Sequence, residues 1–596
     1  MSQQRPYDFQ PVTMPLTRFR YRIQLAALLA LLLSGGVSAQ PLVTVEIDGV
    51  NDTLEDNIRL FLSIEQQRDN PLLSEGRIRR LHQKARGEIE AALQPYGYYR
   101  PRIDASLEAD GDNAWLARYV VDHGPGIPVA VFDLQISGAM ENDEAVDRLV
   151  DAHGLLIDSV FVHPQYDSFK SRLSGLASER GYVEGKFTRG RVEIDLDQYQ
   201  ARVYLAFDSG PRYRFGKVSL EQEVLDPELL QRYIPFREGD PYNLDQVVEL
   251  QRALNDSDYF QVAEVSPGTA DPATLEIPVS VRLLPRKNHR FDFGVGYGTD
   301  TGARALFGWR MPRVNEQGHR LDTRVELSEI GYDVGADYRI PVLNPRTDQM
   351  VYSISEEKEE TDTNDSLLRV VGVSLNHNRG NWRETLSLNY QSETYEVADQ
   401  SGTSDLLIPG VAWSRTWGGN FINVLDGLRF DVGLRGASED LLSDTDFVQL
   451  RGGLKFIFSF DAHNRILARG SFGTTETPDF EQLPSSIRYF AGGSQSVRGY
   501  RYESLGPEDE NGEVVGGRHL LTGSVEYEHY FDDRWGVALF IDAGNAIDSL
   551  GDDLEQGAGF GLRWKSIVGP VRIDLANAIS TDDQDWRLHI NIGPDL

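Results

Sequence analysis

Hydrophobic and polar residues follow two different rhythms along this chain, and the change falls near residue 287. Before it, apolar residues recur at helical spacing between short alternating strands; Ile78, Leu81 and Ala85, for example, share one helix face. After it, apolar and polar residues alternate in segments of about ten residues, a strand pattern without helical spacing. The chain is therefore predicted to consist of small α/β domains followed by an all-β domain.

The first half repeats one unit of strand, helix, helix, strand and strand. In each unit the second helix stops at a turn with an aromatic residue, and an alternating strand later ends at a proline. These shared landmarks favour one repeated fold over the alternative of three unrelated α/β domains. We expect domains at 40–126, 127–212 and 213–286; the aromatic residues are Tyr98, Tyr182 and Tyr259, and the prolines are Pro125, Pro211 and Pro285.

The second half contains about sixteen alternating segments, the pattern of an outer-membrane barrel with an apolar exterior and a polar lumen. Leu428, Phe430 and Val432 alternate with charged residues or glycine, for instance. A segment of about ten residues is long enough for a tilted strand to cross the hydrocarbon layer. An antiparallel, 16-stranded transmembrane β-barrel is predicted for 287–596, and a water-soluble all-β domain is the alternative.

The N-terminus has the layout of a secretory signal peptide. Arg18, Arg20 and Arg22 precede the apolar run 25–33, and small residues then lead to Ala39. The apolar run is too short to span a bilayer as a helix, which disfavours the alternative of an N-terminal anchor. We expect a signal peptide at 1–39, and translation could start at Met1 or at Met14.

Composition narrows the classes of function. Asp and Glu total 92 against 59 Lys and Arg, so the formal net charge is −33, which argues against nucleic acid as a partner because phosphates require clustered cations. The chain has no cysteine, and its histidines lack metal-ligand spacing. Neither an enzyme nor a bound cofactor or metal is expected. A secreted-enzyme barrel is a poorly supported alternative, because no nucleophile is matched to a histidine or paired carboxylates.

Three motifs occur in order within the second half. A long loop, about 476–518, carries Val497, Arg498, Gly499 and Tyr500; a strand at 540–544 reads Phe-Ile-Asp-Ala-Gly; and a closing segment runs over 559–574. Together, behind tandem repeats, they resemble the BamA/TamA superfamily of outer-membrane assembly factors. The resemblance covers essentially the whole mature chain. It implies that the repeats are POTRA domains, that the loop folds back into the lumen, and that Gly544, Gly559 and Gly561 are barrel motif glycines.

The resemblance also implies partners for the loop arginine. In this family the arginine pairs with acidic residues, which here correspond to Asp542 and Glu526. Strand alternation independently turns both carboxylates toward the lumen. An arginine between carboxylates can form bidentate, charge-assisted hydrogen bonds, so we expect Arg498 to tie the loop to the barrel wall.

Barrel closure requires the first strand, 290–298, to pair with the last, 586–596. Proline donates no ladder hydrogen bond and glycine weakens a strand, so closure here should be weaker than elsewhere. The resemblance implies that this seam opens sideways and that client strands pair with it. The glycines could instead simply make room for packing in the lumen. The seam residues are Gly294, Gly296, Gly298, Gly593 and Pro594.

Three repeats and sixteen strands are most similar to the TamA branch of this superfamily. That similarity implies an outer-membrane location with the repeats in the periplasm, a TamB-like inner-membrane-anchored partner, and unfolded outer-membrane client proteins, autotransporters among them. The lipid bilayer is the barrel's surroundings. The alternatives are a general assembly factor, a two-partner secretion pore, or a passive pore or receptor, for which Arg498 would make no buried contact.

Overall fold

The computed structural model describes residues 42–592 except 69, 71, 111–113, 153, 419–425, 567–568 and 581–585. The expected signal peptide at 1–39 and the expected seam residues Gly593 and Pro594 lie outside the described residues. The described residues divide into two compact units, with the boundary between residues 213 and 214. Within the described range, no helix combines the length and the apolar character that a membrane span needs.

Three small α/β domains precede the barrel, each with a three-stranded sheet whose last strand lies in the centre, parallel to the first and antiparallel to the second. The first comprises β1 (Leu42–Asp48), α2 (Asp52–Phe61), α3 (Ser63–Gln66), α4 (Glu75–Leu93), η1 (Gln94–Tyr96), β2 (Arg102–Ala109) and β3 (Ala114–Asp122). The second comprises β4 (Val129–Ser137), α5 (Glu144–Asp151), α6 (His163–Glu179), β5 (Lys186–Asp195) and β6 (Gln200–Asp208). The third comprises β7 (Arg214–Glu221), α7 (Pro227–Gln231), α8 (Leu244–Asn255), β8 (Phe260–Pro267) and β9 (Glu276–Pro285).

A turn with one residue in the left-handed conformation follows the last helix of each of the three domains. Its key residue has a positive φ, 86° at Gly97, 85° at Gly181 and 61° at Asp258. Aspartate is one of the few residues that tolerates this left-handed conformation, so it can replace glycine in the third domain. The aromatic residue that follows turns back onto the domain, and Tyr182 and Tyr259 are buried there.

The predicted apolar helix faces form the cores of these domains. In α4, Ile78, Leu81 and Ala85 are buried against the sheet, as their spacing required. Burying one large aliphatic side chain contributes about 1.5–3 kcal/mol, so the stripe along α4 is a main source of stability for the first domain.

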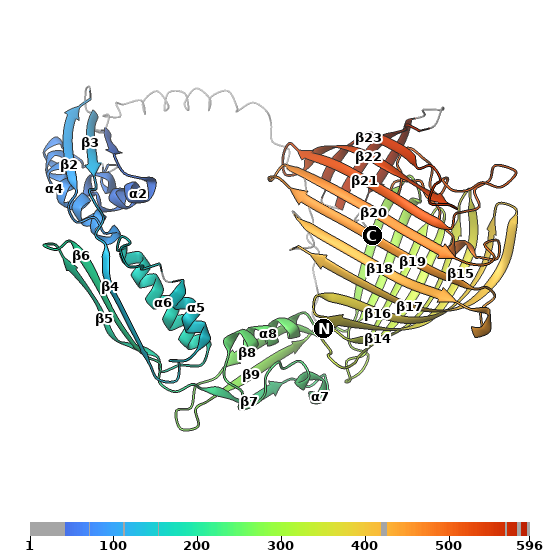
Figure 1. Ribbon diagram of the computed structural model, residues 1–596, viewed down its shortest axis with the longest axis horizontal. Coiled ribbons are helices and arrows are strands. Elements are labelled where there is room, and N and C mark those ends of the chain that lie inside the picture. The colour runs from blue at the N-terminus through green and yellow to red at the C-terminus, as the bar shows by residue number, and fades with distance from the viewer. Residues whose placement is uncertain are drawn as a thin grey trace, which may run out of the picture. The chain divides into compact units, whose positions relative to one another are not determined.

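The described residues of the second half form sixteen strands that close into an antiparallel barrel, as predicted (Figure 1). Along β22, Leu539 and Ile541 point outward and are exposed, whereas Asp542 points into the lumen and is fully buried. The strands are β10 (Arg290–Gly298), β11 (Gly302–Met311), β12 (Arg320–Ser328), β13 (Gly331–Pro341), β14 (Gln349–Glu360), β15 (Asn364–Arg379), β16 (Trp382–Val397), β17 (Gln400–Trp417), β18 (Gly427–Ala437), β19 (Phe447–Ser459), β20 (Asn464–Glu476), β21 (His519–Tyr530), β22 (Trp535–Ile547), β23 (Glu555–Ser566), β24 (Gly569–Ala578) and β25 (Trp586–Ile592).

Several strands are longer than the ten or so residues expected from bilayer thickness. Strands β15 and β16 have 16 residues each and β17 has 18. The acidic segment 356–360 extends β14, which is paired with β15 as far as Asp365. Paired strands satisfy their backbone hydrogen bonds wherever they lie, so the ladder does not have to stop where the apolar pattern stops.

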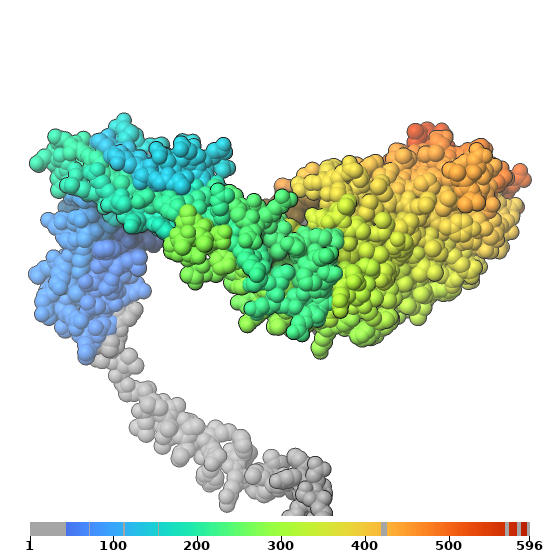
Figure 2. All heavy atoms as spheres, turned by 90° about the horizontal axis from the view of Figure 1, so that it is seen from below, coloured from blue at the N-terminus to red at the C-terminus, as the bar shows by residue number. Residues whose placement is uncertain are grey.

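The third domain contacts the barrel mainly through carbonyl oxygens. The Tyr259 hydroxyl donates to the Gly318 carbonyl at 2.5 Å, and the Arg320 guanidinium donates to the Ser257 carbonyl at 2.5 Å and lies over the Tyr259 ring. Arg232 donates to the Val342 carbonyl at 2.8 Å. The green spheres of this domain abut the yellow-green first strands of the barrel in Figure 2. The third domain and the barrel therefore form one unit.

Candidate lumen anchor and barrel seam

The long loop between β20 and β21 lies inside the barrel, where its arginine is held by several acidic residues. Arg498 donates to both oxygens of Asp542, at 2.7 and 2.9 Å, and to Glu526 at 2.7 Å. Its own backbone N–H donates to Asp542 at 3.0 Å, and its guanidinium lies 3.4 Å from the centroid of the Phe540 ring. The sequence-predicted trio of Arg498, Asp542 and Glu526 thus lies together in the lumen.

A second buried arginine, Arg563 of β23, joins the same cluster. It donates to Glu526 at 2.5 Å, to Glu528 at 3.0 Å and to Asp574 at 2.5 Å. Asp574 also accepts from Arg498 at 3.1 Å, so Glu526 and Asp574 each bridge the two arginines. The sequence interpretation did not assign Arg563, Glu528 or Asp574 to the site. Strand alternation could have indicated them, because it turns all three side chains toward the lumen in β21 and in the closing segment.

Burial determines what this cluster contributes. The side chains of Arg498 and Asp542 are 4% and 0% exposed, so water cannot replace a lost partner. Removing one member of a buried ion pair commonly costs about 3–5 kcal/mol, because an uncompensated charge remains. The cluster therefore holds the loop in one position relative to β21–β24.

The other motif residues pack around the arginine. Val497 and Tyr500 form a small apolar cluster with Ala578, and the Tyr500 hydroxyl donates to Glu555 at 2.8 Å. The Gly499 N–H donates to Nε2 of His589 at 3.0 Å. Each residue of the motif thus contacts the wall or its neighbours, and the loop tip is held at several points.

The motif glycines leave room for these contacts. A Cβ on Gly561 would lie 1.8 Å from Asp574 Oδ1, and a Cβ on Gly557 would lie 1.9 Å from the Arg498 carbonyl oxygen. Gly544 and Gly559 face strand backbone, where a Cβ would lie 2.5 Å from the Leu521 oxygen and 2.2 Å from the Leu575 oxygen. Gly557, which directly admits the loop, was not among the predicted glycines.

The base of the loop is attached to the opposite side of the lumen. Glu393 of β16 accepts from the Ser485 hydroxyl at 2.6 Å and from the Ser486 N–H at 3.1 Å. Arg488 donates to the Leu483 carbonyl at 2.8 Å within the loop. Apolar side chains of the loop and the wall also pack together there, and the cluster consists of Leu406, Ile408, Phe447, Leu483 and Ile487.

The seam joins the first strand, β10, to the last, β25. The described ladder pairs Tyr297 with Ile592 and Gly298 with Asn591, where the described part of β25 ends, and β24 and β25 pair from Val571–Ile592 to Asn577–Trp586. A Cβ on Gly296 would lie 2.6 Å from the Ile592 oxygen. Among the described seam glycines, Gly296 is therefore the one that the described part of β25 approaches most closely.

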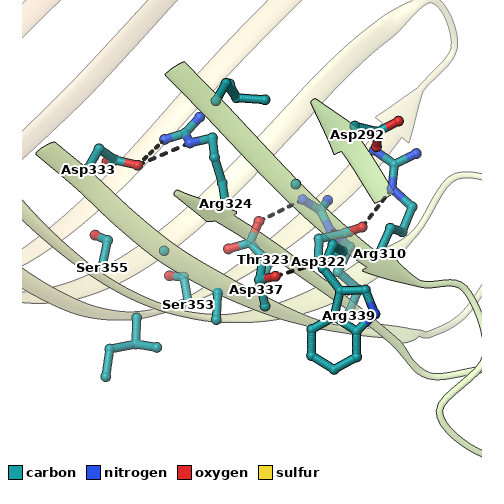
Figure 3. A pocket seen from close by; sticks show the side chains of 16 residues that line it. Asp292, Arg310, Asp322, Thr323, Arg324, Asp333, Asp337, Arg339, Ser353 and Ser355 are labelled. Carbon is teal, nitrogen blue, oxygen red and sulfur yellow. Dashed lines mark hydrogen bonds and ion pairs between the residues drawn. The ribbon is translucent and has the colours of Figure 1, made fainter. Parts of the chain in front are cut away.

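The lumen wall of β10–β14 surrounds a polar cavity of about 470 Å³ (Figure 3). Asp322 accepts a hydrogen bond from Arg310 at 2.8 Å and forms an ion pair with Arg339 at 2.8 Å, and Arg324 donates to Asp333 at 2.9 Å. Unlike the loop cluster, these groups are partly exposed to the lumen. Among the residues that the structure describes, no group of three or more His, Cys, Asp or Glu is placed to hold a metal ion.

Comparisons with known proteins agree with this architecture. Residues 286–595 match the family model of the Omp85 superfamily domain. Residues 44–123 match the model of POTRA domain TamA domain 1, and residues 213–284 match a POTRA model described as a surface antigen variable number repeat.

Individual relatives are more distant. The outer membrane protein assembly factor BamA of Nitratidesulfovibrio vulgaris is 33% identical over 108 residues, which span 17% of this chain and only 13% of that protein. The crystal structure of BamA from Haemophilus ducreyi lacking POTRA domains 1–3 superposes with a TM-score of 0.65 at 16% identity, covering 78% of this chain and 99% of that one. CdiB from Acinetobacter baumannii has a TM-score of 0.46 at 15% identity, covering 78% and 90% of the two chains.

Proposed function

Because this chain belongs to the Omp85 superfamily, with POTRA domains before its barrel, we propose that it is the outer-membrane subunit of a protein translocation and assembly machine. By family inference the barrel lies in the outer membrane and the POTRA domains in the periplasm. As a member of this family of assembly and transport components, the chain is not an enzyme. Its clients are unfolded β-barrel or autotransporter proteins, which it inserts or secretes by opening its seam sideways.

The observation that carries this proposal is the family match of a closed 16-stranded barrel behind POTRA domains. A client strand can take the place of β25 only after the ladder between β10 and β25 breaks. Glycine weakens a strand, and β10 carries Gly294, Gly296 and Gly298, so this ladder is the one that we expect to open. An opened β10 would offer its backbone groups to an incoming strand by β-augmentation.

A disulfide across the seam tests the proposal. Tyr297→Cys with Ile592→Cys joins two residues that face each other across the seam, and the chain has no native cysteine to interfere. We expect the oxidised form to lose client assembly and reduction to restore it, measured by protease protection of an autotransporter barrel in vesicles.

The matched control places the same chemistry elsewhere. Tyr352→Cys with Val373→Cys joins β14 to β15, which are paired throughout. This control should assemble clients in both redox states. Full client assembly by the oxidised seam variant would exclude lateral opening.

We further propose a TamA-like role with a TamB-like periplasmic partner. The match of the first domain to a TamA-type POTRA model and the presence of three POTRA-like domains support it. A general assembly factor is the second candidate, and the stretch of 33% identity to a BamA protein favours it.

Depletion of the protein in its own cells separates these two roles. A TamA-like subunit should be needed for a subset of clients that includes autotransporters, whereas loss of a general factor should lower all abundant barrel proteins. Quantitative proteomics of outer membranes provides the measurement. A uniform fall across barrel proteins would exclude the TamA-like role.

A further inference from the structure

The tip of the lumen loop contacts groups on both sides of the seam. On one side stands Asp300, in the turn between β10 and β11. It accepts from the Ser494 N–H at 2.7 Å and from the Ser494 hydroxyl at 2.6 Å. A carboxylate that accepts two hydrogen bonds from one residue fixes that residue in both position and orientation.

The other side of the seam is held by His589 of β25. This ring is 3% exposed, and its Nε2 accepts from the Gly499 N–H at 3.0 Å. Because Nε2 is the acceptor, the neutral ring carries its proton on Nδ1. That nitrogen makes no hydrogen bond within the described part of the chain and lies 4.0 Å from Asp300 Oδ1. The two seam-side groups thus face each other beneath the loop tip.

The loop backbone fits closely between these two groups. Gly493 has a φ of 92°, and a Cβ there would lie 3.0 Å from Asp300 Oδ2. Direct hydrogen bonds also join the described seam: the Thr299 N–H donates to the Ile590 carbonyl at 3.0 Å, and the Ile590 N–H donates to the Thr299 hydroxyl at 3.4 Å. The loop adds contacts to Asp300 and His589 from inside the lumen.

We propose that Ser494, Asp300 and His589 form a latch, in which the loop tip bridges the first and last strands and must leave Asp300 before the seam opens. The arginine cluster holds the loop to β21–β24, whereas the Ser494–Asp300 contact is the part that reaches across to β10. The use of this latch in client assembly rests on the proposed function, but its effect on the seam can be measured alone.

Spin-label distances across the seam test the latch without client or partner. Labels on Phe307→Cys of β11 and Phe560→Cys of β23 flank the seam on the exposed outer face. Labels on Tyr352→Cys of β14 and Leu434→Cys of β18 lie the same number of strands apart without spanning it. We expect Asp300→Ala to increase the population at long distance about fivefold across the seam, the effect of losing about one net hydrogen bond, and to leave the second pair unchanged.

Two further variants keep the test sharp. Ser494→Ala removes the hydroxyl but keeps the N–H donor, so it should open the seam less than Asp300→Ala. Ser496→Ala is the matched control, because in the described part of the chain that hydroxyl accepts from the Gly492 N–H within the loop rather than from the seam. A folded barrel is verified by its heat-dependent mobility on gels.

Unchanged distances across the seam in folded Asp300→Ala and Ser494→Ala barrels would overturn the latch, and so would an equal effect from Ser496→Ala. A looser seam in Asp300→Ala, together with full client assembly by the oxidised Tyr297→Cys/Ile592→Cys barrel, would uphold the latch and contradict lateral opening, so the two proposals fail separately.

Discussion

Two sets of arginine–carboxylate contacts line the same lumen, and they differ chiefly in their exposure to water. The loop cluster around Arg498 is dry, and its members share partners. On the wall of β12 and β13, Arg324 bonds Asp333 with side chains that are 59% and 22% exposed. Similar residues therefore act as a fixed anchor in one place and as a solvated lining in the other, because only the buried charges depend entirely on each other.

The largest expected effect comes from breaking the dry cluster. Arg498→Ala leaves Asp542 buried without its bidentate partner, which should lower the free energy of unfolding by about 3–5 kcal/mol. Guanidinium titration of the barrel in lipid vesicles measures this change. A loss below that of the exposed Arg324→Ala control would contradict the contrast between the two regions.

The next effect tests whether the loop needs space rather than charge. Gly557→Ala brings a methyl group against the Arg498 carbonyl oxygen and should cost about 1–3 kcal/mol through overpacking. Gly470→Ala is the control, because a Cβ there lies 3.6 Å from its nearest neighbour, an ordinary contact. The same titration compares the free energies of unfolding of the two variants. Equal values would mean that the loop can shift away from the added methyl group without loss of stability.

A smaller effect on stability is expected in the second POTRA domain, where an ion pair joins a buried carboxylate to a partly exposed arginine. Asp143 caps α5 and bonds Arg180 at 2.8 Å. Burial alone would raise the pKa of its carboxyl, but hydrogen bonds from Arg180, the Ala145 N–H and Tyr182 outweigh burial and hold that pKa below its usual value. The stabilisation that the Asp143 carboxylate gives to the fold is therefore complete above the pKa of the unfolded chain, and it is lost as the pH falls through the lower pKa of the folded chain.

Asp143→Asn should remove this pH dependence, and Asp143→Ala should cost about 1 kcal/mol at neutral pH through loss of the cap. Hydrogen exchange of the α5 amides in the full chain, measured from neutral pH to below pH 4, tests both expectations. A wild-type α5 whose protection does not fall with acidity would refute this account.

The smallest effect is predicted for the exposed wall. Arg324→Ala should change the free energy of unfolding by no more than about 1 kcal/mol, because water solvates the remaining Asp333. Guanidinium titration again provides the measurement. A cost comparable to that of Arg498→Ala would show that the lumen wall is drier than its exposure indicates.

Strand alternation allowed the barrel and part of the lumen cluster to be predicted, because alternation alone turns Asp542 and Glu526 toward the lumen. Arg563 has the same parity, but alternation does not say which inward residues meet across strands. The contact between Ser494 and Asp300 joins residues 194 positions apart, and it depends on where the loop tip comes to rest. Strand length was wrong for β15–β17, because the apolar pattern reports bilayer thickness rather than the end of pairing.

The joint between the third POTRA domain and the barrel has a consequence for how the chain tolerates change. Its hydrogen bonds from Tyr259 and Arg232 end on the carbonyl oxygens of Gly318 and Val342, and every amino acid supplies a carbonyl. The residue type at Val342 can therefore change while the joint persists, provided that the backbone path is kept. Gly318 is the exception, because its φ is 75° and a Cβ there would lie 2.5 Å from Leu229. Insertions or deletions in these turns should be more harmful than substitutions elsewhere in them.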